Sequence, residues 1–309
     1  MIETKAATAP ERGRPHRVRE ERLALLFLAP ALLVMFAVNV YPVLYALWIS
    51  LHRSDLRRPL NNPFVGLGNF RDVFAESYFG VSLLHTVQFT VLAVALATLL
   101  GLAAALILNE KFRLQPVAFA MLLIPWAVPS VVNGLMWKWI YDSQFGSLNG
   151  LLYTLGLIDT YQPMLGDPAK AMYLVINAFV WKEVPLAGLL FLTTLKSIPH
   201  EMYEAAMVDG ADALRRFRYI TLPSLKPAFL LVLIYNTMQA IRAFDIIYVL
   251  TEGGPGDATS NLAWMAYQES FRHLNLGRGS AMAYLIAMGT FVIAYWYLKA
   301  LGREATDHA

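Results

Sequence analysis

The sequence predicts an all-α membrane protein with six transmembrane helices and both termini in the cytoplasm. Of 309 residues, 57% are hydrophobic and only 15% are charged, with a mean hydropathy of +0.48. Soluble domains carry about 25% charged residues. Six apolar runs also reach the roughly 20 residues that a helix needs to cross the hydrocarbon of a bilayer.

The six apolar runs give the order of the expected spans. They cover about residues 23–51, 83–108, 116–140, 171–195, 227–250 and 280–301. Prolines interrupt several of them, and a bundle tolerates this because neighbouring groups hydrogen-bond the backbone atoms that a proline leaves unpaired. These prolines are Pro30, Pro42, Pro125, Pro129 and Pro185.

The connecting segments predict the orientation, because cytoplasmic segments carry an excess of Lys and Arg. If the N-terminus lies inside, the inner segments hold fifteen basic residues and the outer segments hold six. The inner segments are 1–22, 109–115, 196–226 and 299–309. This imbalance favours cytoplasmic termini and a cytoplasmic connection between the fourth and fifth spans.

The domain organisation follows from these spans. We expect a basic cytoplasmic N-terminal segment at 1–22, one membrane domain at 23–301 and a short cytoplasmic tail at 302–309. The net charge of +3 reflects the inside bias and does not indicate nucleic-acid binding. The chain has no cysteine, which excludes disulfides, thiolate metal sites and a cysteine nucleophile.

A polar, charged segment between the fourth and fifth spans predicts two short helices. The first runs from Pro199 to Val208, with Pro199 in its first turn and Ser197 as its cap. Gly210 breaks it because glycine adopts left-handed backbone angles without a side-chain penalty. The second carries three arginines among apolar residues and ends at Leu222-Pro223. An interfacial hairpin that contacts anionic lipid headgroups has the same composition.

The spacing of residues within this segment favours a surface that receives a partner protein over a lipid-bound hairpin. It reads E-A-A, three residues, G, nine residues, I, one residue, L-P, from Glu204 to Pro223. This pattern resembles the cytoplasmic loop of the permease subunits of binding-protein-dependent ATP-binding cassette (ABC) importers. Leu28-Ala29-Pro30, Tyr41-Pro42 and Gly253-Gly254-Pro255 look like the carbohydrate-uptake branch of that family, which takes up maltose, trehalose or glycerol phosphate.

The resemblance implies a sugar-import subunit of the type I fold in a bacterial or archaeal inner or plasma membrane. Residues 197–223 would be the loop that couples the permease to the ATPase. Its matching residues are Glu204, Ala205, Ala206, Asp209, Gly210, Ile220, Leu222 and Pro223. The expected partners are a second, distinct permease, two ATP-binding cassette subunits, an extracytoplasmic sugar-binding protein and membrane lipid, with no nucleic acid.

The chain itself is not expected to be an enzyme or to hold a cofactor. It contains no G-x-x-x-x-G-K-[ST] phosphate loop, and no glycine is followed by lysine. ATP and Mg²⁺ would therefore be bound by the partner ATPase.

Polar residues inside the spans are candidates for the substrate path, because charges at bilayer depth are costly and usually face a cavity or a partner. The candidates are Asn133, Trp137, Trp181, Asn236, Gln239, Arg242 and Asp245. Structural roles are equally open. Arg242 and Asp245, three residues apart on one helix face, can form a neutral pair. Lys182 and Glu183 can pair with other helices, and Trp137 can belong to an interfacial aromatic belt.

Two other classes of function fit part of the sequence. An ion-coupled secondary transporter would explain the intramembrane charges, but it would not explain the spaced pattern from Glu204 to Pro223. An intramembrane enzyme acting on lipid-linked substrates would need clustered acids, histidines or a metal site. The six histidines are scattered, and no H-E-x-x-H motif occurs.

Overall fold

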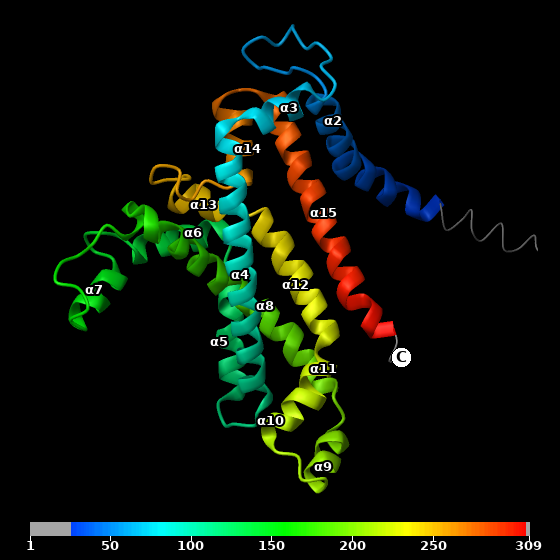
Figure 1. Ribbon diagram of the computed structural model, residues 1–309, viewed down its shortest axis with the longest axis vertical. Coiled ribbons are helices and arrows are strands. Elements are labelled where there is room, and N and C mark those ends of the chain that lie inside the picture. Colours follow the sequence, from blue (N-terminus) through cyan, green and yellow to red (C-terminus); the bar gives the residue numbers. More distant parts are fainter. Residues whose placement is uncertain (1–25, 307–309) are drawn as a thin grey trace, which may run out of the picture. The chain divides into compact units, whose positions relative to one another are not determined.

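The computed structural model describes residues 26–306, with side chains up to residue 300, and nearly all of these residues are helical (Figure 1). They fall into two compact units, one ending at Ile49 and the other beginning at Ser50. The expected N-terminal segment 1–22 and residues 307–309 of the expected tail lie outside the described part of the chain.

The described part of the first unit belongs to one apolar helix, Leu26–Ser50, which matches the first predicted span. A π-helical turn, η1 (Phe36–Val40), precedes α2 (Tyr41–Ser50), and the backbone N–H of Tyr41 donates to the carbonyl of Phe36. Pro42 has no N–H and its ring crowds the carbonyl four residues earlier, so the helix widens here instead of following a regular ladder.

The second unit contains the remaining helices. Four of them run lengthwise in Figure 1: α4 (Ser77–Asn109), α8 (Pro168–Ser197), α12 (Lys226–Ile241) and α15 (Leu276–Thr306). One end carries α9 (His200–Val208), α10 (Ala213–Arg216), η3 (Phe217–Thr221) and α11 (Leu222–Ser224). The others are α3 (Gly68–Ala75), α5 (Gln115–Ala127), α6 (Ser130–Ile140), α7 (Ser147–Thr154), η2 (Met164–Gly166), α13 (Asp245–Leu250), α14 (Leu262–Tyr267) and η4 (Gln268–Arg272).

Among the described residues, four helices are long and apolar enough to cross a membrane, or up to six if each bent pair counts as one span. The pair α5 and α6 bends by 101°. Pro129 causes this break, because a proline pushes the preceding residue out of the helical region, and Val128 is extended.

The predicted continuous fifth span at 227–250 is wrong. The helix α12 ends at Ile241, and a separate helix, α13, begins at Asp245. At its other end α12 forms a bent pair with Ala213–Ser224, at 61°. The sequence predicted that the second short helix ends at Leu222-Pro223, but the helical structure continues to Ser224.

Close packing of α4 against α8 forms the frame of the second unit. One face of α4 carries small buried residues at a spacing of four: Ala93, Ala97, Gly101 and Ala105. Small residues allow two helix backbones to approach closely. A Cβ atom on Gly101 would lie 2.6 Å from the Cβ of Ala187 and 3.0 Å from the backbone N of Gly188.

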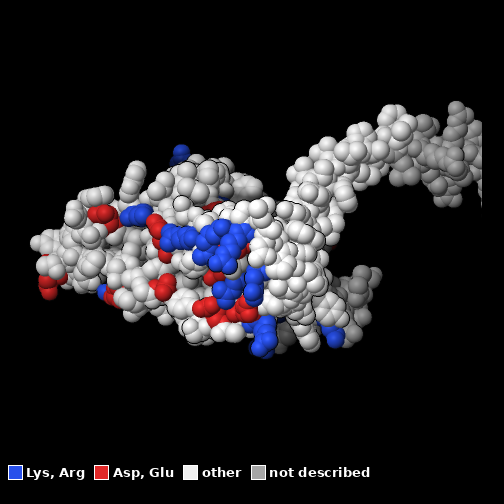
Figure 2. Space-filling model, turned by 90° about the horizontal axis from the view of Figure 1, so that it is seen from above, with Lys and Arg blue, Asp and Glu red and all other residues white. Residues whose placement is uncertain are grey.

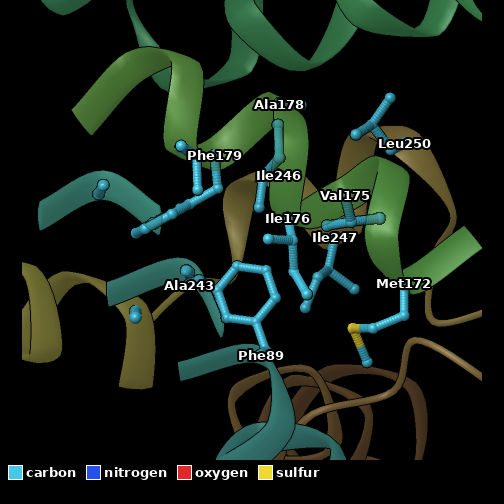
Figure 3. Packing of buried hydrophobic residues seen from close by; sticks show 14 of the residues in the cluster. Phe89, Met172, Val175, Ile176, Ala178, Phe179, Ala243, Ile246, Ile247 and Leu250 are labelled. Carbon is cyan, nitrogen blue, oxygen red and sulfur yellow. The ribbon is translucent and has the colours of Figure 1, made fainter. Parts of the chain in front are cut away.

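Two layers of apolar side chains extend this frame. In the first, Phe89 of α4 packs with Ile176 and Phe179 of α8 and with Ile246 and Ile247 of α13 (Figure 3). In the second, nearer to α9, Phe191 and Leu195 of α8 pack with Leu225 and Val232. The helix α8 begins at a cap, because the carboxylate of Asp167 accepts from the N–H of Ala169 at 2.9 Å. This hydrogen bond holds the pKa of Asp167 below its usual value.

Charged residues gather on the end face that carries α3. Figure 2 shows Lys and Arg side chains beside Asp and Glu on this face. Arg57 pairs with Asp55 at 2.7 Å, and Arg278 pairs with Glu76 at 3.0 Å. These two arginines are therefore locally neutralised.

The contact at Gly101 gives a test of the frame. We expect Gly101→Ala to lower the free energy of unfolding by about 1–3 kcal/mol, because the added methyl group meets the backbone of α8. The thermal midpoint of the detergent-solubilised protein measures this loss. Gly80→Ala in the same helix is the control, because a Cβ there has no neighbour within 4 Å. Equal midpoints for the two variants would contradict the close-packing argument.

Candidate functional site

Two features of the second unit are candidates for function. One is a cavity of about 330 Å³, which we call the central cavity. Its walls come from the start of α6, the middle of α8, and the end of α12 with the start of α13. The lining residues are Ser130, Asn133, Phe179, Lys182, Glu183, Gln239, Arg242, Ala243, Phe244, Asp245 and Ile246.

The central cavity lies beside both interruptions in the helices. Ser130 is the first residue of α6, directly after the break at Val128-Pro129. Arg242 and Phe244 belong to the break between α12 and α13. Non-helical backbone within a membrane bundle is tolerated where it is buried in protein or lines a cavity. The local geometry is therefore that of a polar site built from broken helices.

The structure brings four of the seven candidate path residues to this cavity: Asn133, Gln239, Arg242 and Asp245. The other three lie elsewhere. Trp137 packs edge-on against Trp181, with ring centroids 6.0 Å apart. Asn236 is fully buried on α12, and neither polar atom of its amide has a hydrogen-bond partner within the described residues.

The expected pair of Arg242 and Asp245 is wrong as a helix-face pair, because α12 ends at Ile241 and α13 begins only at Asp245. Arg242 instead donates from Nε to the carbonyl of Met238 at 2.9 Å and from a terminal nitrogen to Oε1 of Gln239 at 3.1 Å. Asp245 forms no ion pair with any described residue. The Arg242 side chain is thus held by residues of α12, and it does not pair with the Asp245 carboxylate at the cavity wall.

Two buried acceptors at the cavity have no donor. Asn133 is 1% exposed, and its Nδ2 donates to the carbonyl of Ala178 at 3.0 Å, while Oδ1 has no hydrogen-bond partner among the described residues. Glu183 is 2% exposed, and its Oε2 likewise has none. Buried acceptors without donors are costly. Both atoms are shielded from solvent in this structure, so a donor in the cavity would reach them only after this wall rearranges.

The second feature is the arm, which we define as residues 200–224 and which contains α9, α10, η3 and α11. All eight residues of the spaced motif lie on it, and six of them are exposed: Glu204, Ala205, Asp209, Gly210, Leu222 and Pro223. Ala206 and Ile220 are half-buried. Apolar side chains also face outward, with Val208 88% and Leu214 74% exposed. Exposed apolar patches of this kind mark interaction surfaces.

Local hydrogen bonds fix the shape of the arm. Gly210 has φ = +77°, and the N–H of Ala211 donates back to the carbonyl of Ala206 at 2.8 Å. These contacts form a left-handed helix terminus that glycine favours. Asp212 caps the next helix through the N–H of Arg215, at 2.8 Å. The hydroxyls of Tyr203 and Thr221, 2.9 Å apart, tie the two halves of the arm together.

The predicted start of α9 needs correction. Pro199 is the N-cap residue and not the first helical residue, and the cap has no side-chain hydrogen bond. Ser197 belongs to α8, and its hydroxyl donates to the carbonyl of Thr194 at 2.7 Å. The long helix α8 uses the serine that the sequence assigned to the next helix.

A groove of about 860 Å³ separates the arm from the segment that follows α4. Glu110 and Lys111 line one side, and Tyr203, Arg216 and Phe217 line the other. Within residues 26–300, no group of three or more acidic or histidine side chains is placed to hold a metal ion.

Sequence reasoning missed part of the central cavity. Ser130 carried no signal except its place after Pro129. Glu183 and Lys182 stood out as intramembrane charges, but one-dimensional spacing could not say what they face. The hydrogen bond between Tyr203 and Thr221 was also missed, because only the turn at Gly210 brings these two residues together.

Comparisons with known proteins match nearly the whole chain. Residues 97–304 match the family described as "Binding-protein-dependent transport system inner membrane component". The chain is 41% identical to the trehalose/maltose transport system permease protein MalF of Thermococcus litoralis, over 94% of this chain and 97% of the relative. It is 36% identical to the trehalose transport system permease protein SugA of Mycobacterium tuberculosis, over 98% and 96%.

The fold has a solved relative. A chain of a bacterial ABC transporter that imports the acidic polysaccharide alginate superposes with a TM-score of 0.81, at 18% identity, over 93% of this chain and 98% of that one. At this identity the likeness concerns the fold alone.

The turn at Gly210 gives a test of the arm. We expect Gly210→Val to speed backbone hydrogen exchange of residues 200–211 about tenfold, because a side chain in the left-handed region costs about 1–2 kcal/mol. Gly210→Asn is the matched control, since asparagine tolerates these angles. Hydrogen exchange read by mass spectrometry distinguishes the two. Equal protection in both variants would contradict the role of the left-handed turn.

Proposed function

Because the chain belongs to the family of binding-protein-dependent transport system inner membrane components, we propose that its substrate is a sugar or a closely related solute. It is a transmembrane permease subunit of an ABC importer of the sugar-transport kind. Relatives that are at least 36% identical and nearly full-length include permeases named for trehalose and maltose transport. This membership replaces the ion-coupled transporter and the intramembrane enzyme as interpretations.

The arm faces the cytoplasm and both chain termini lie on the same side of a bacterial or archaeal inner membrane. The distribution of Lys and Arg supports this orientation. Arg215, Arg216 and Arg218 on the arm form no ion pair with a described residue, whereas Arg57 and Arg278 at the opposite end are paired.

The arm couples this subunit to a separate ATPase that binds ATP and Mg²⁺. Its exposed motif residues and its outward-facing Val208 and Leu214 form the mixed polar and apolar surface that a partner would cover. Closure of two ATP-binding cassette subunits around ATP would displace the arm. Because α12 follows the arm after a single non-helical residue, Leu225, this displacement would reach the central cavity at Arg242.

The central cavity is this subunit's part of the solute path. The observation that carries this assignment is the pair of buried acceptors, Asn133 Oδ1 and Glu183 Oε2, that have no donor among the described residues. Sugar hydroxyl groups are donors, so they would satisfy both atoms once the cavity wall opens, since neither atom is exposed in this structure. Asn133, Gln239, Arg242 and Asp245 are proposed to face the solute, while Trp137, Trp181 and Asn236 would support the walls.

A second, distinct permease subunit would complete the pathway, because the cavity is bounded by helices of one chain on only some of its sides. A sugar-binding protein outside the membrane would deliver the solute to the end of the molecule that carries α3. The expected assembly is therefore two permeases, two ATPases and one binding protein.

Charge reversal on the arm tests the coupling. In the assembled transporter, we expect Glu204→Lys to reduce sugar uptake at least about tenfold, a change that corresponds to about 1.4 kcal/mol, while ATP hydrolysis continues. Parallel assays of ATP turnover and uptake in proteoliposomes measure this separation. Glu110→Lys is the control, because it makes the same charge change at the same end but off the arm. Normal coupling in the Glu204 variant would rule out the proposed contact.

An isosteric substitution in the cavity tests the solute path. We expect Glu183→Gln to raise the KM for uptake about tenfold, since a hydrogen bond to a charged group contributes about 1.5–3 kcal/mol. Uptake of a panel of labelled sugars gives KM and maximal rate for each. Glu110→Gln, outside the cavity and in no ion pair with a described residue, should leave both unchanged. If KM is unaltered for every transported sugar, Glu183 does not contact the solute.

A further inference from the structure

The break between α12 and α13 leaves a backbone carbonyl that needs a partner. Residues 242–244 are not helical, and Ala243, which lines the central cavity, is only 7% exposed. A buried carbonyl without a donor costs about 1–3 kcal/mol. The side-chain Nδ2 of Asn261 donates to the Ala243 carbonyl at 2.7 Å, in a fully buried hydrogen bond between residues 18 apart in the chain.

The same asparagine also caps a helix. Its Oδ1 accepts from the N–H of Trp264 at 2.8 Å, in the first turn of α14. One side chain therefore holds both the broken backbone at the cavity and the N-terminus of α14. The amide is fully buried, and its donor and acceptor sides are both used.

Asn261 belongs to a segment that other contacts hold independently of the break. We call residues 259–262 the strap. The N–H of Leu262 donates to Oγ1 of Thr86 on α4 at 2.9 Å, and Nδ1 of His85 lies 3.1 Å from the carbonyl of Ser260. The hydroxyl of Thr259 donates to the carbonyl of Gly254 at 2.8 Å. The strap thus has a position of its own, to which Asn261 ties the break.

We propose that Asn261 is a positioning residue for solute recognition, although it does not line the central cavity. Asp245 follows Ala243 by two residues and lines the cavity, so the position of the Ala243 carbonyl bears on where this carboxylate stands, whereas the Arg242 side chain is held by Met238 and Gln239 of α12. This inference rests on the proposed function, because the cavity must receive a solute for the positioning to matter.

The test separates the two hydrogen bonds of Asn261. Asn261→Asp keeps an oxygen that can cap α14 and replaces the donor to Ala243 with an acceptor. In the assembled transporter, we expect its KM for sugar to rise about tenfold, with the maximal rate within about twofold, as loss of one buried hydrogen bond predicts. The matched control is Asn149→Asp, because Asn149 is an equally buried asparagine whose Nδ2 donates to the carbonyls of Asp142 and Gln162, away from the cavity.

A second readout does not depend on the solute. The chain has no cysteine, so Asp245→Cys introduces a single thiol whose maleimide labelling in membranes reports access to the cavity. We expect Asn261→Asp to change this labelling rate about threefold or more, the effect of a shift of under 1 kcal/mol, and Asn149→Asp to leave it unchanged. If Asn261→Asp fails to insert, Thr86→Val, which loosens the strap from α4, should move KM and labelling in the same direction.

The outcomes separate the inference from the function on which it rests. A raised KM and altered labelling in the Asn261 variant alone support the positioning role. Equal effects in the Asn149 variant, or an unchanged KM with unchanged labelling, overturn it. If the unmodified transporter takes up no sugar, the proposed substrate class fails, and the labelling rates alone decide whether Asn261 positions the cavity wall.

Discussion

The structure depends on one constraint, which is that backbone polar groups inside a lipid-embedded bundle need partners within the protein. Continuous helices such as α4 meet this constraint by themselves. The breaks at Val128-Pro129 and at 242–244 do not, and the structure places the central cavity beside both of them. At the second break the Asn261 amide supplies the missing donor. The polar site thus arises where the helices are interrupted and side chains replace the helical ladder.

Rigid and movable parts of the molecule are arranged around this site. The close contact of Gly101 with Ala187 and Gly188 joins α4 and α8 into a frame with little free volume. The arm projects from this frame, and the bond between Tyr203 and Thr221 makes its two halves one body. A single helix, α12, runs from the arm to Arg242. One helix thus connects the arm to the cavity wall, and we propose that it transmits movement of the arm to the cavity during transport.

Several features could be read directly from the sequence because they depend on local chemistry. Each predicted apolar run overlaps a candidate membrane helix or bent pair of the structure, and the left-handed backbone at Gly210 followed from a glycine in a turn. The errors concern where helices end. No proline or glycine marks 242–244, so the fifth span seemed continuous and Arg242 seemed able to pair with Asp245. Ser197 seemed to be a cap, but α8 extends through it.

The sequence by itself determined the membrane class, the succession of apolar segments and the arm with its motif, because hydropathy and turn chemistry act over short stretches of chain. The spaced residues from Glu204 to Pro223 also indicated the family, to which the full-length relatives assign the chain. Only the tertiary structure decided which polar residues share the cavity, which acceptors lack donors and how Asn261 holds Ala243. These depend on how helices distant in sequence pack, because a buried polar group finds its partner through space and not through its position in the chain.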